Sequence, residues 1–249
     1  MAKALIVANW KMNPPTFREA KELFEATRQA VEKSKRTSII VAPPSIFLRE
    51  LSASYRGRTL TFAVQHAHYE EHGAHTGEIS MVQAHDAKAT AVIIGHAERR
   101  AFGETNEDTR KKVAAALSFN MTPILCVGEE TRTVSGEYFN VVKDQLRAGF
   151  GDVPDTRINR VTVVYEPLWT IGKETTMSPR QMHEMAIFMR KTMVNMYGEK
   201  GIALRILYGG SVDEENALAM LSEGDVLGFL VGRASADAEK FAGLLGVIG

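Results

Sequence analysis

Short apolar runs recur along the whole chain, and polar segments with helical spacing separate them. The runs lie at residues 4–8, 38–42, 60–64, 90–94, 123–127, 161–165, 203–208 and 228–231. Most of them are continuous rather than alternating, which is typical of parallel strands that are covered on both faces. The pattern therefore predicts eight buried strands.

The segments between the runs carry helix start patterns. Three have the spacing of a capping box: Thr16-x-x-Glu19, Ser80-x-x-Gln83 and Ser178-Pro-x-Gln181. Beyond Thr16, apolar residues recur every three or four positions and predict a helix with one buried face. A stripe of methionines predicts another such face, at Met182, Met185, Met189, Met193 and Met196.

Eight strand-then-helix units in 249 residues match a single-domain (β/α)8 barrel of eight parallel strands. The competing architecture is a doubly wound open sheet. That fold favours a glycine-rich phosphate loop after the first strand, whereas residues 9–13 read NWKMN and contain no glycine. We therefore predict the barrel.

The charge balance and the cysteine content restrict the partners and the compartment that we expect. The chain has 30 basic and 30 acidic side chains, so no global field favours a nucleic acid or an anionic membrane as a partner. The single cysteine, Cys126, cannot form an internal disulfide, which fits a reducing compartment. No apolar run approaches the roughly eighteen residues of a membrane span. We expect a cytoplasmic protein.

Barrels of this type place their chemistry at the carboxyl ends of the strands. Those ends collect chemically capable residues: Asn9, Lys11, Gln65, His66, His96, Glu98, Cys126, Glu129, Glu166, Gly209, Gly210, Ser211, Gly232 and Arg233. The set includes a carboxylate base, a histidine, an ammonium group and glycine-bearing turns that can direct N–H groups at an anion. Such a set suits proton transfer on a small phosphorylated substrate.

Seven strings of residues carry a resemblance to a known family. They are NWKMN (9–13), HGAHTGEIS (72–80), GHAERRAFGET (95–105), LCVGEE (125–130), YEPLWTIG (165–172), YGGSV (208–212) and GFLVGRAS (228–235). In this order they resemble the triosephosphate isomerases over essentially the full chain. The resemblance implies a TIM barrel that interconverts dihydroxyacetone phosphate and D-glyceraldehyde 3-phosphate, with no cofactor and no metal.

The same resemblance implies roles for particular residues. Glu166 would be the base, His96 a neutral imidazole that polarises the substrate carbonyl, and Lys11 the positive charge beside the developing oxyanion, with Asn9 as a further donor. The phosphate would meet the backbone N–H groups of Gly172, Ser211, Gly232 and Arg233.

Two loops also acquire roles from the resemblance. Residues 167–177 would form a lid whose exposed Trp169 and Ile171 become buried when it closes. Residues 65–80 would reach across a two-fold axis into a second subunit, so we expect a homodimer.

Other polar clusters have plainer interpretations. We expect Glu98, Arg99, Arg100 and Glu104 to form a structural ion network around the turn after the fourth strand. We expect Cys126 to be a small buried side chain. The spacing of His66, His68, His72 and His75 matches no known zinc pattern, so we expect no metal site there.

The chain departs from the family pattern at five positions. Ala97 replaces a serine that partners the base, His66 an asparagine, Glu174 a lid glycine, Leu227 an aspartate and Arg233 the second glycine of the phosphate-binding pair. We expect the Arg233 side chain to point to solvent, with contact to the phosphate as the alternative. These departures motivate an alternative function, that of a catalytically weakened family member that acts as a phosphate-ligand or interaction protein.

Overall fold

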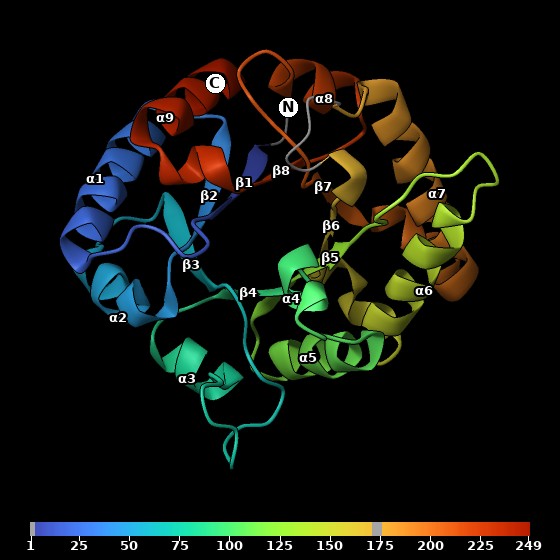
Figure 1. Cartoon of the computed structure of the whole chain (residues 1–249), viewed down its shortest axis with the longest axis horizontal. Coiled ribbons are helices and arrows are strands. Elements are labelled where there is room, and N and C mark those ends of the chain that lie inside the picture. The colour runs from blue at the N-terminus through green and yellow to red at the C-terminus, as the bar shows by residue number, and fades with distance from the viewer. Residues whose placement is uncertain (1–2, 171–175) are drawn as a thin grey trace.

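Eight parallel strands close into a barrel, as the apolar runs predict (Figure 1). The computed structural model describes residues 3–170 and 176–249. Each strand pairs with its neighbours in sequence, and β8 returns to pair with β1. The strands are β1 (Ala4–Asn9), β2 (Thr37–Ala42), β3 (Leu60–Val64), β4 (Ala91–Ile94), β5 (Thr122–Val127), β6 (Thr162–Tyr165), β7 (Arg205–Tyr208) and β8 (Gly228–Val231).

Both faces of each strand are buried, which explains the continuous apolar runs. In β1, Leu5 and Val7 point into the barrel interior and share one apolar cluster with Cys126 of β5. Ile6 and Ala8 belong to the larger cluster between the barrel and its helices. Alternate residues of one strand therefore serve two separate cores.

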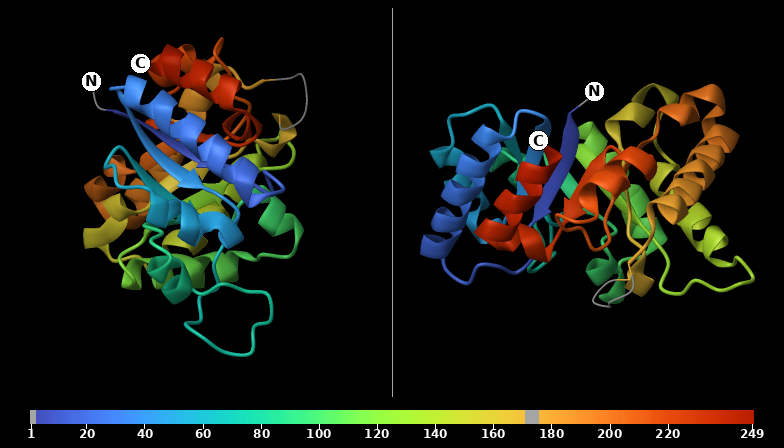
Figure 2. Two further views of the ribbon diagram at one scale, coloured as in Figure 1. Left: turned by 90° about the vertical axis from the view of Figure 1, so that its left-hand side faces the viewer. Right: turned by 90° about the horizontal axis from the view of Figure 1, so that it is seen from above.

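Helices surround the barrel on all sides (Figures 1 and 2). Within the described residues they are α1 (Phe17–Lys33), α2 (Ser45–Ser54), α3 (Met81–Asp86), α4 (Ala97–Ala101), α5 (Asn106–Ser118), α6 (Tyr138–Phe150), α7 (Pro179–Tyr197), α8 (Ala217–Glu223) and α9 (Ala238–Ile248). Short 3-10 helices are η1 (Asp155–Arg160), η2 (Leu168–Thr170), η3 (Gly198–Ala203) and η4 (Arg233–Ala236).

The predicted helix starts are largely correct. Ser80 and Ser178 each form a complete capping box with the residue three positions on. Thr16 accepts a bond from the N–H of Glu19 at 3.3 Å and so caps α1. The methionines of α7 are buried up to Met193, which confirms the core-facing stripe, and Met196 is partly buried.

β7 begins two residues later than predicted. The apolar run at 203–208 suggested a strand from residue 203, but Ala203 ends η3 and β7 starts at Arg205. Gly201 lies so close to α7 that a Cβ there would meet the backbone of Met193 at 2.3 Å. The chain must turn tightly against this helix before it can extend.

The loop between β3 and α3 projects away from the body of the molecule (Figures 1 and 2). Its base is closed by a bridge between His68 and Ser80 and by a bond from the His68 N–H to the Ile79 carbonyl at 2.7 Å. Residues 70–77 are exposed. Within the described ranges, no helix has the length and apolarity needed to cross a membrane.

Candidate active site

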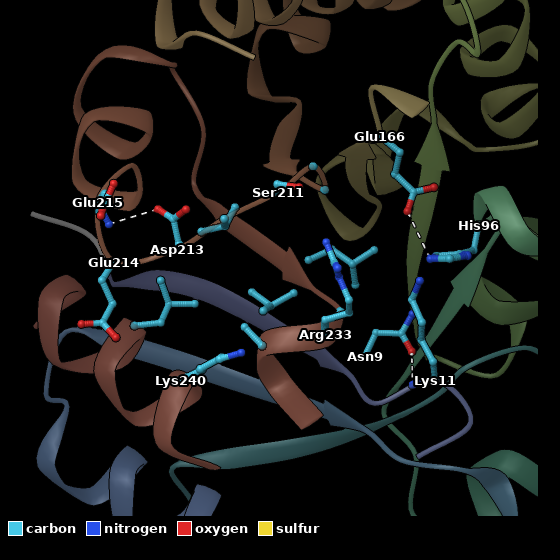
Figure 3. Close-up of a pocket in the computed structure, with 18 residues that line it drawn as sticks. Asn9, Lys11, His96, Glu166, Ser211, Asp213, Glu214, Glu215, Arg233 and Lys240 are labelled. Atoms are coloured by element: carbon cyan, nitrogen blue, oxygen red, sulfur yellow. Dashed lines mark hydrogen bonds and ion pairs between the residues drawn. The ribbon is translucent and has the colours of Figure 1, made fainter. Parts of the chain in front are cut away.

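A cavity of about 770 Å³ lies at the carboxyl ends of the strands (Figure 3). Seven of the eight residues predicted for the site line it: Asn9, Lys11, His96, Glu166, Ser211, Gly232 and Arg233. They come from β1, β4, β6, β7 and β8 or the positions that follow these strands. The eighth, Gly172, lies outside the described residues, as do Ile171 and Glu174.

Glu166 is held at the wall of the cavity although only 2% of its surface is exposed. Its own N–H donates to the carbonyl of Val127 at 2.8 Å, which extends the β5–β6 pairing by one residue. Its Oε2 accepts the N–H of Ala97 at 3.0 Å, and its Oε1 lies 3.3 Å from Nε2 of His96. The carboxylate is therefore desolvated, oriented and in contact with a second acid–base group.

Two glycines make room for the backbone and the side-chain stem of Glu166. A Cβ at Gly128 would lie 1.8 Å from the carbonyl oxygen of Glu166, and a Cβ at Gly209 would lie 2.9 Å from its Cγ. Neither position can carry a side chain without moving Glu166. Both glycines belong to the strings that carry the family resemblance, but sequence reasoning assigned them no role toward the base.

His96 has its tautomer set by the helix that follows it. Nδ1 accepts the N–H of Glu98 at 3.2 Å at the start of α4. An accepting Nδ1 leaves the ring hydrogen on Nε2, which faces Glu166 and the cavity. The residue is 8% exposed, and Nε2 presents its N–H to whatever occupies the cavity.

Lys11 is positioned by contacts to its main chain and to its side chain. Its φ of 54° is in the left-handed region, and the turn is held by a bond from its N–H to Oδ1 of Asn9 at 3.1 Å. Gln65 donates to the Lys11 carbonyl at 2.8 Å. Glu98 pairs with the ammonium at 2.6 Å. From the sequence, Gln65 was identified only as a residue at the end of a strand, with no predicted contact to Lys11.

Ser211, Gly232 and Arg233 line the part of the cavity next to Asn9 and Lys11. Gly232 lies against the stem of Lys11, because a Cβ there would be 3.2 Å from Lys11 Cε. Arg233 is the first residue of η4. Its φ is not positive: among the described non-glycine residues, φ is positive only at Lys11, Lys88, Asn120 and Asp225. Arg233 therefore adopts its backbone conformation without the strain that a replaced glycine can impose.

The turn after β4 is clamped by two of the four residues expected there. Oε1 of Glu104 accepts the Gly95 N–H at 2.9 Å, and Nε of Arg100 donates to the Gly95 carbonyl at 2.9 Å. Glu98 does not join this clamp, since its carboxylate reaches Lys11 instead. The expectation of a purely structural network is therefore wrong for Glu98.

Trp169 is also placed differently from the expectation of an exposed lid side chain. It is partly buried against the core, and its indole N–H donates to Oε1 of Glu129 at 3.0 Å. The same oxygen accepts the hydroxyl of Tyr165 at 2.7 Å. Burial raises the pKa of Glu129, and the two donors oppose that shift.

His66, which replaces the family's asparagine, lies in a group of charged side chains. Its Nε2 is 2.6 Å from Glu78, and Lys112, Arg99 and Glu104 also face the ring. Burial, and then the charge of Lys112, lower the pKa of His66 despite the bond to Glu78. The ring is thus held mainly in its neutral form.

Cys126 is fully buried in the barrel interior, as expected. Burial, followed by the nearby Glu166 carboxylate, raises the pKa of its thiol well above the usual value. A thiol in that state is a poor nucleophile.

Comparisons with known proteins agree with this geometry. The family model described as triosephosphate isomerase matches residues 4–248. A protein named triosephosphate isomerase from Endomicrobium trichonymphae is 39% identical over 247 residues, covering 98% of each chain. One of the same name from Caldanaerobacter subterraneus subsp. tengcongensis is 39% identical over 245 residues, covering 97% of this chain and 98% of its own.

Proposed function

The chain belongs to the triosephosphate isomerase family, and from this premise we propose how its cavity carries out the reaction. The protein is an isomerase that interconverts dihydroxyacetone phosphate and D-glyceraldehyde 3-phosphate. The reaction moves a proton between two adjacent carbons and requires a base, an electrophile and a grip on the phosphate. Each is available among the residues that line the cavity.

Glu166 is the proposed base. It takes a proton from the carbon next to the carbonyl and returns it to the former carbonyl carbon, while the hydroxyl proton passes from one enediolate oxygen to the other. The observation that carries this assignment is its desolvated carboxylate, fixed by the Ala97 N–H at 3.0 Å and 3.3 Å from His96. Loss of water raises the basicity of a carboxylate and strengthens its interactions with neighbouring dipoles.

His96 and Lys11 stabilise the enediolate that forms when the proton leaves. The Nε2–H of His96 donates to the substrate oxygen on which negative charge develops. The Lys11 ammonium, which lines the same cavity, adds positive charge, and Asn9 fixes the turn that carries it. Glu98 holds the ammonium in the free enzyme, so substrate must share or replace that ion pair.

The phosphate is proposed to bind at the end of the cavity lined by Ser211, Gly232 and Arg233. Gly172 is proposed to complete this site from residues 167–177, the proposed lid. Closure of such a lid excludes water and protects the enediolate from losing its phosphate.

We propose a homodimer in which residues 65–80 pack into the partner. The support is the projecting loop together with apolar side chains left in solvent, Met12 at 92% and Phe102 at 82% exposure. Met12 follows β1, the loop follows β3, and Phe102 follows β4 and α4, so all three lie beyond the carboxyl ends of their strands. The compartment that we propose is the cytoplasm, where a lone buried thiol such as Cys126 stays reduced.

A coupled assay tests the function directly. Purified protein is supplied with D-glyceraldehyde 3-phosphate, and the dihydroxyacetone phosphate formed is reduced by an auxiliary dehydrogenase that consumes NADH. We expect turnover that is abolished by His96→Ala. Absence of turnover in the wild-type protein would favour the alternative of a phosphate-ligand protein.

A further inference from the structure

Three cationic side chains line the cavity, and two of them have an anionic partner. Lys11 pairs with Glu98 at 2.6 Å and Lys240 with Asp237 at 3.7 Å. Arg233 is the third, and it makes no ion pair or hydrogen bond through its side chain with any residue of the described ranges. A cation without a partner in a substrate cavity is available to an anionic ligand.

The direction of the side chain supports this interpretation. In Figure 3 the Arg233 guanidinium points away from its own backbone, toward the part of the cavity between Ser211 and Glu166. Gly232, which follows β8, lies against the side-chain stem of Lys11: a Cβ added at this glycine would be 3.2 Å from Lys11 Cε. Arg233 and Lys11 therefore flank one end of the same cavity.

Guanidinium chemistry suits this position. Arginine presents a planar fork of N–H donors that matches two phosphate oxygens, and it stays charged at all working pH values. Binding an anion to Arg233 breaks no ion pair within the described residues, whereas binding to Lys11 competes with Glu98. Of the three cations, Arg233 can engage a phosphate at the lowest cost.

We propose that the Arg233 side chain binds the phosphate group of the substrate directly, in addition to the backbone N–H groups at Ser211 and Gly232. The proposal rests on the proposed function, and it adopts the alternative of the sequence analysis, contact with the phosphate, for a side chain that is exposed in the structure. It makes Arg233 a phosphate-binding residue that sets the affinity of this enzyme for phosphorylated trioses. The isomerisation itself remains with Glu166, His96 and Lys11.

The test measures binding of inorganic phosphate by titration calorimetry, which needs no turnover. We expect Arg233→Gln to weaken phosphate binding about tenfold or more, the value of a lost charge-assisted hydrogen bond. Arg233→Lys keeps the charge but loses the planar fork of donors, so its phosphate affinity should lie between those of wild type and Arg233→Gln. The matched control is Lys240→Gln, since Lys240 lines the same cavity but pairs with Asp237, and it should bind within about twofold of wild type.

Steady-state kinetics add a second measurement. Arg233→Gln should raise KM for D-glyceraldehyde 3-phosphate about tenfold or more and change kcat much less, as expected for a contact made equally in the ground and transition states. Phosphate binding by Arg233→Gln within twofold of wild type, tighter binding, or no measurable binding by the wild type would each overturn the proposal. A wild-type protein that binds phosphate through Arg233 but shows no turnover would overturn only the proposed function.

Discussion

The backbone N–H of Ala97 donates to Oε2 of Glu166 at 3.0 Å, across 69 residues of sequence. The family pattern places a serine at position 97, and its absence suggested a base without a partner. The peptide group supplies that partner instead. The base is therefore oriented by an atom that every residue type at position 97 except proline would provide.

Restoring the serine should have a modest effect. In Ala97→Ser the hydroxyl adds a second donor near Glu166 while the N–H bond remains. We predict a rise in kcat/KM worth roughly one hydrogen bond, about 0.5–1.5 kcal/mol, measured by steady-state kinetics in both directions. An unchanged or lower kcat/KM would mean that the N–H alone orients the base sufficiently.

Glu129 connects β5 to the start of the proposed lid. Glu129→Ala removes the acceptor of the Tyr165 hydroxyl and of the Trp169 indole N–H, in a site where Glu129 is 1% exposed. Two buried donors without acceptors should cost about 2–4 kcal/mol of unfolding free energy, measured by urea denaturation. The exposed neighbour Glu130, changed to alanine, is the control and should cost far less. Equal losses in the two variants would refute the assigned role.

His66 should make stability depend on pH. Its pKa in the folded protein lies below the ordinary 6.5, so below about pH 6.5 the unfolded chain binds more protons than the folded chain. The stability that the neutral ring contributes is complete above the unfolded pKa and is lost as pH falls toward the folded value. We predict that His66→Asn is less acid-sensitive than wild type.

The measurement is urea unfolding of both proteins at about pH 7.5 and pH 5.5. The loss of unfolding free energy between the two pH values should be larger for wild type than for His66→Asn. The exposed His85, changed to asparagine, is the control and should behave as wild type does. Identical losses in wild type and His66→Asn would show that the Lys112 and Glu78 surroundings do not couple His66 to folding.

The dimer can be tested at an apolar side chain left in solvent. Phe102 is 82% exposed on the side of the molecule that carries the projecting loop. We predict that Phe102→Glu weakens dimerisation, because an interface would bury the carboxylate without a partner. Light scattering over a concentration series should give a dimer for wild type and a shift to monomer for the variant. A wild-type monomer at micromolar concentration with full activity would contradict the proposed assembly.

The strands were predictable because their residues are buried on both faces. In β1, Leu5 and Val7 enter one core and Ile6 and Ala8 the other, so the strand carries an unbroken apolar run. Helix starts were predictable where the residue three positions after the N-cap is Glu or Gln. The capping box of Thr105 with Asp108 was missed because its partner is an aspartate.

The supporting contacts of the site could not be predicted in the same way. Gln65 reaches the Lys11 carbonyl across 54 residues, Lys11 reaches Glu98 across 87, and Trp169 reaches Glu129 across 40. Such pairs depend on barrel closure, which no local spacing records. The seven predicted residues that line the cavity were identified because they lie at strand ends and in the strings that resemble the family, whereas Asp213 and Lys240, which also line it, were not.

Glu166→Asp tests most directly whether Glu166 is the base. The variant keeps the carboxylate but withdraws it by one methylene from the position fixed by Ala97 and His96. Misplacement by about 1 Å can cost on the order of 10²-fold in rate. Steady-state kinetics in both directions should show that loss in kcat, with KM nearly unchanged because Ser211, Gly232 and Arg233 are untouched. A variant that keeps near wild-type kcat would contradict the account, since the base would then lie elsewhere.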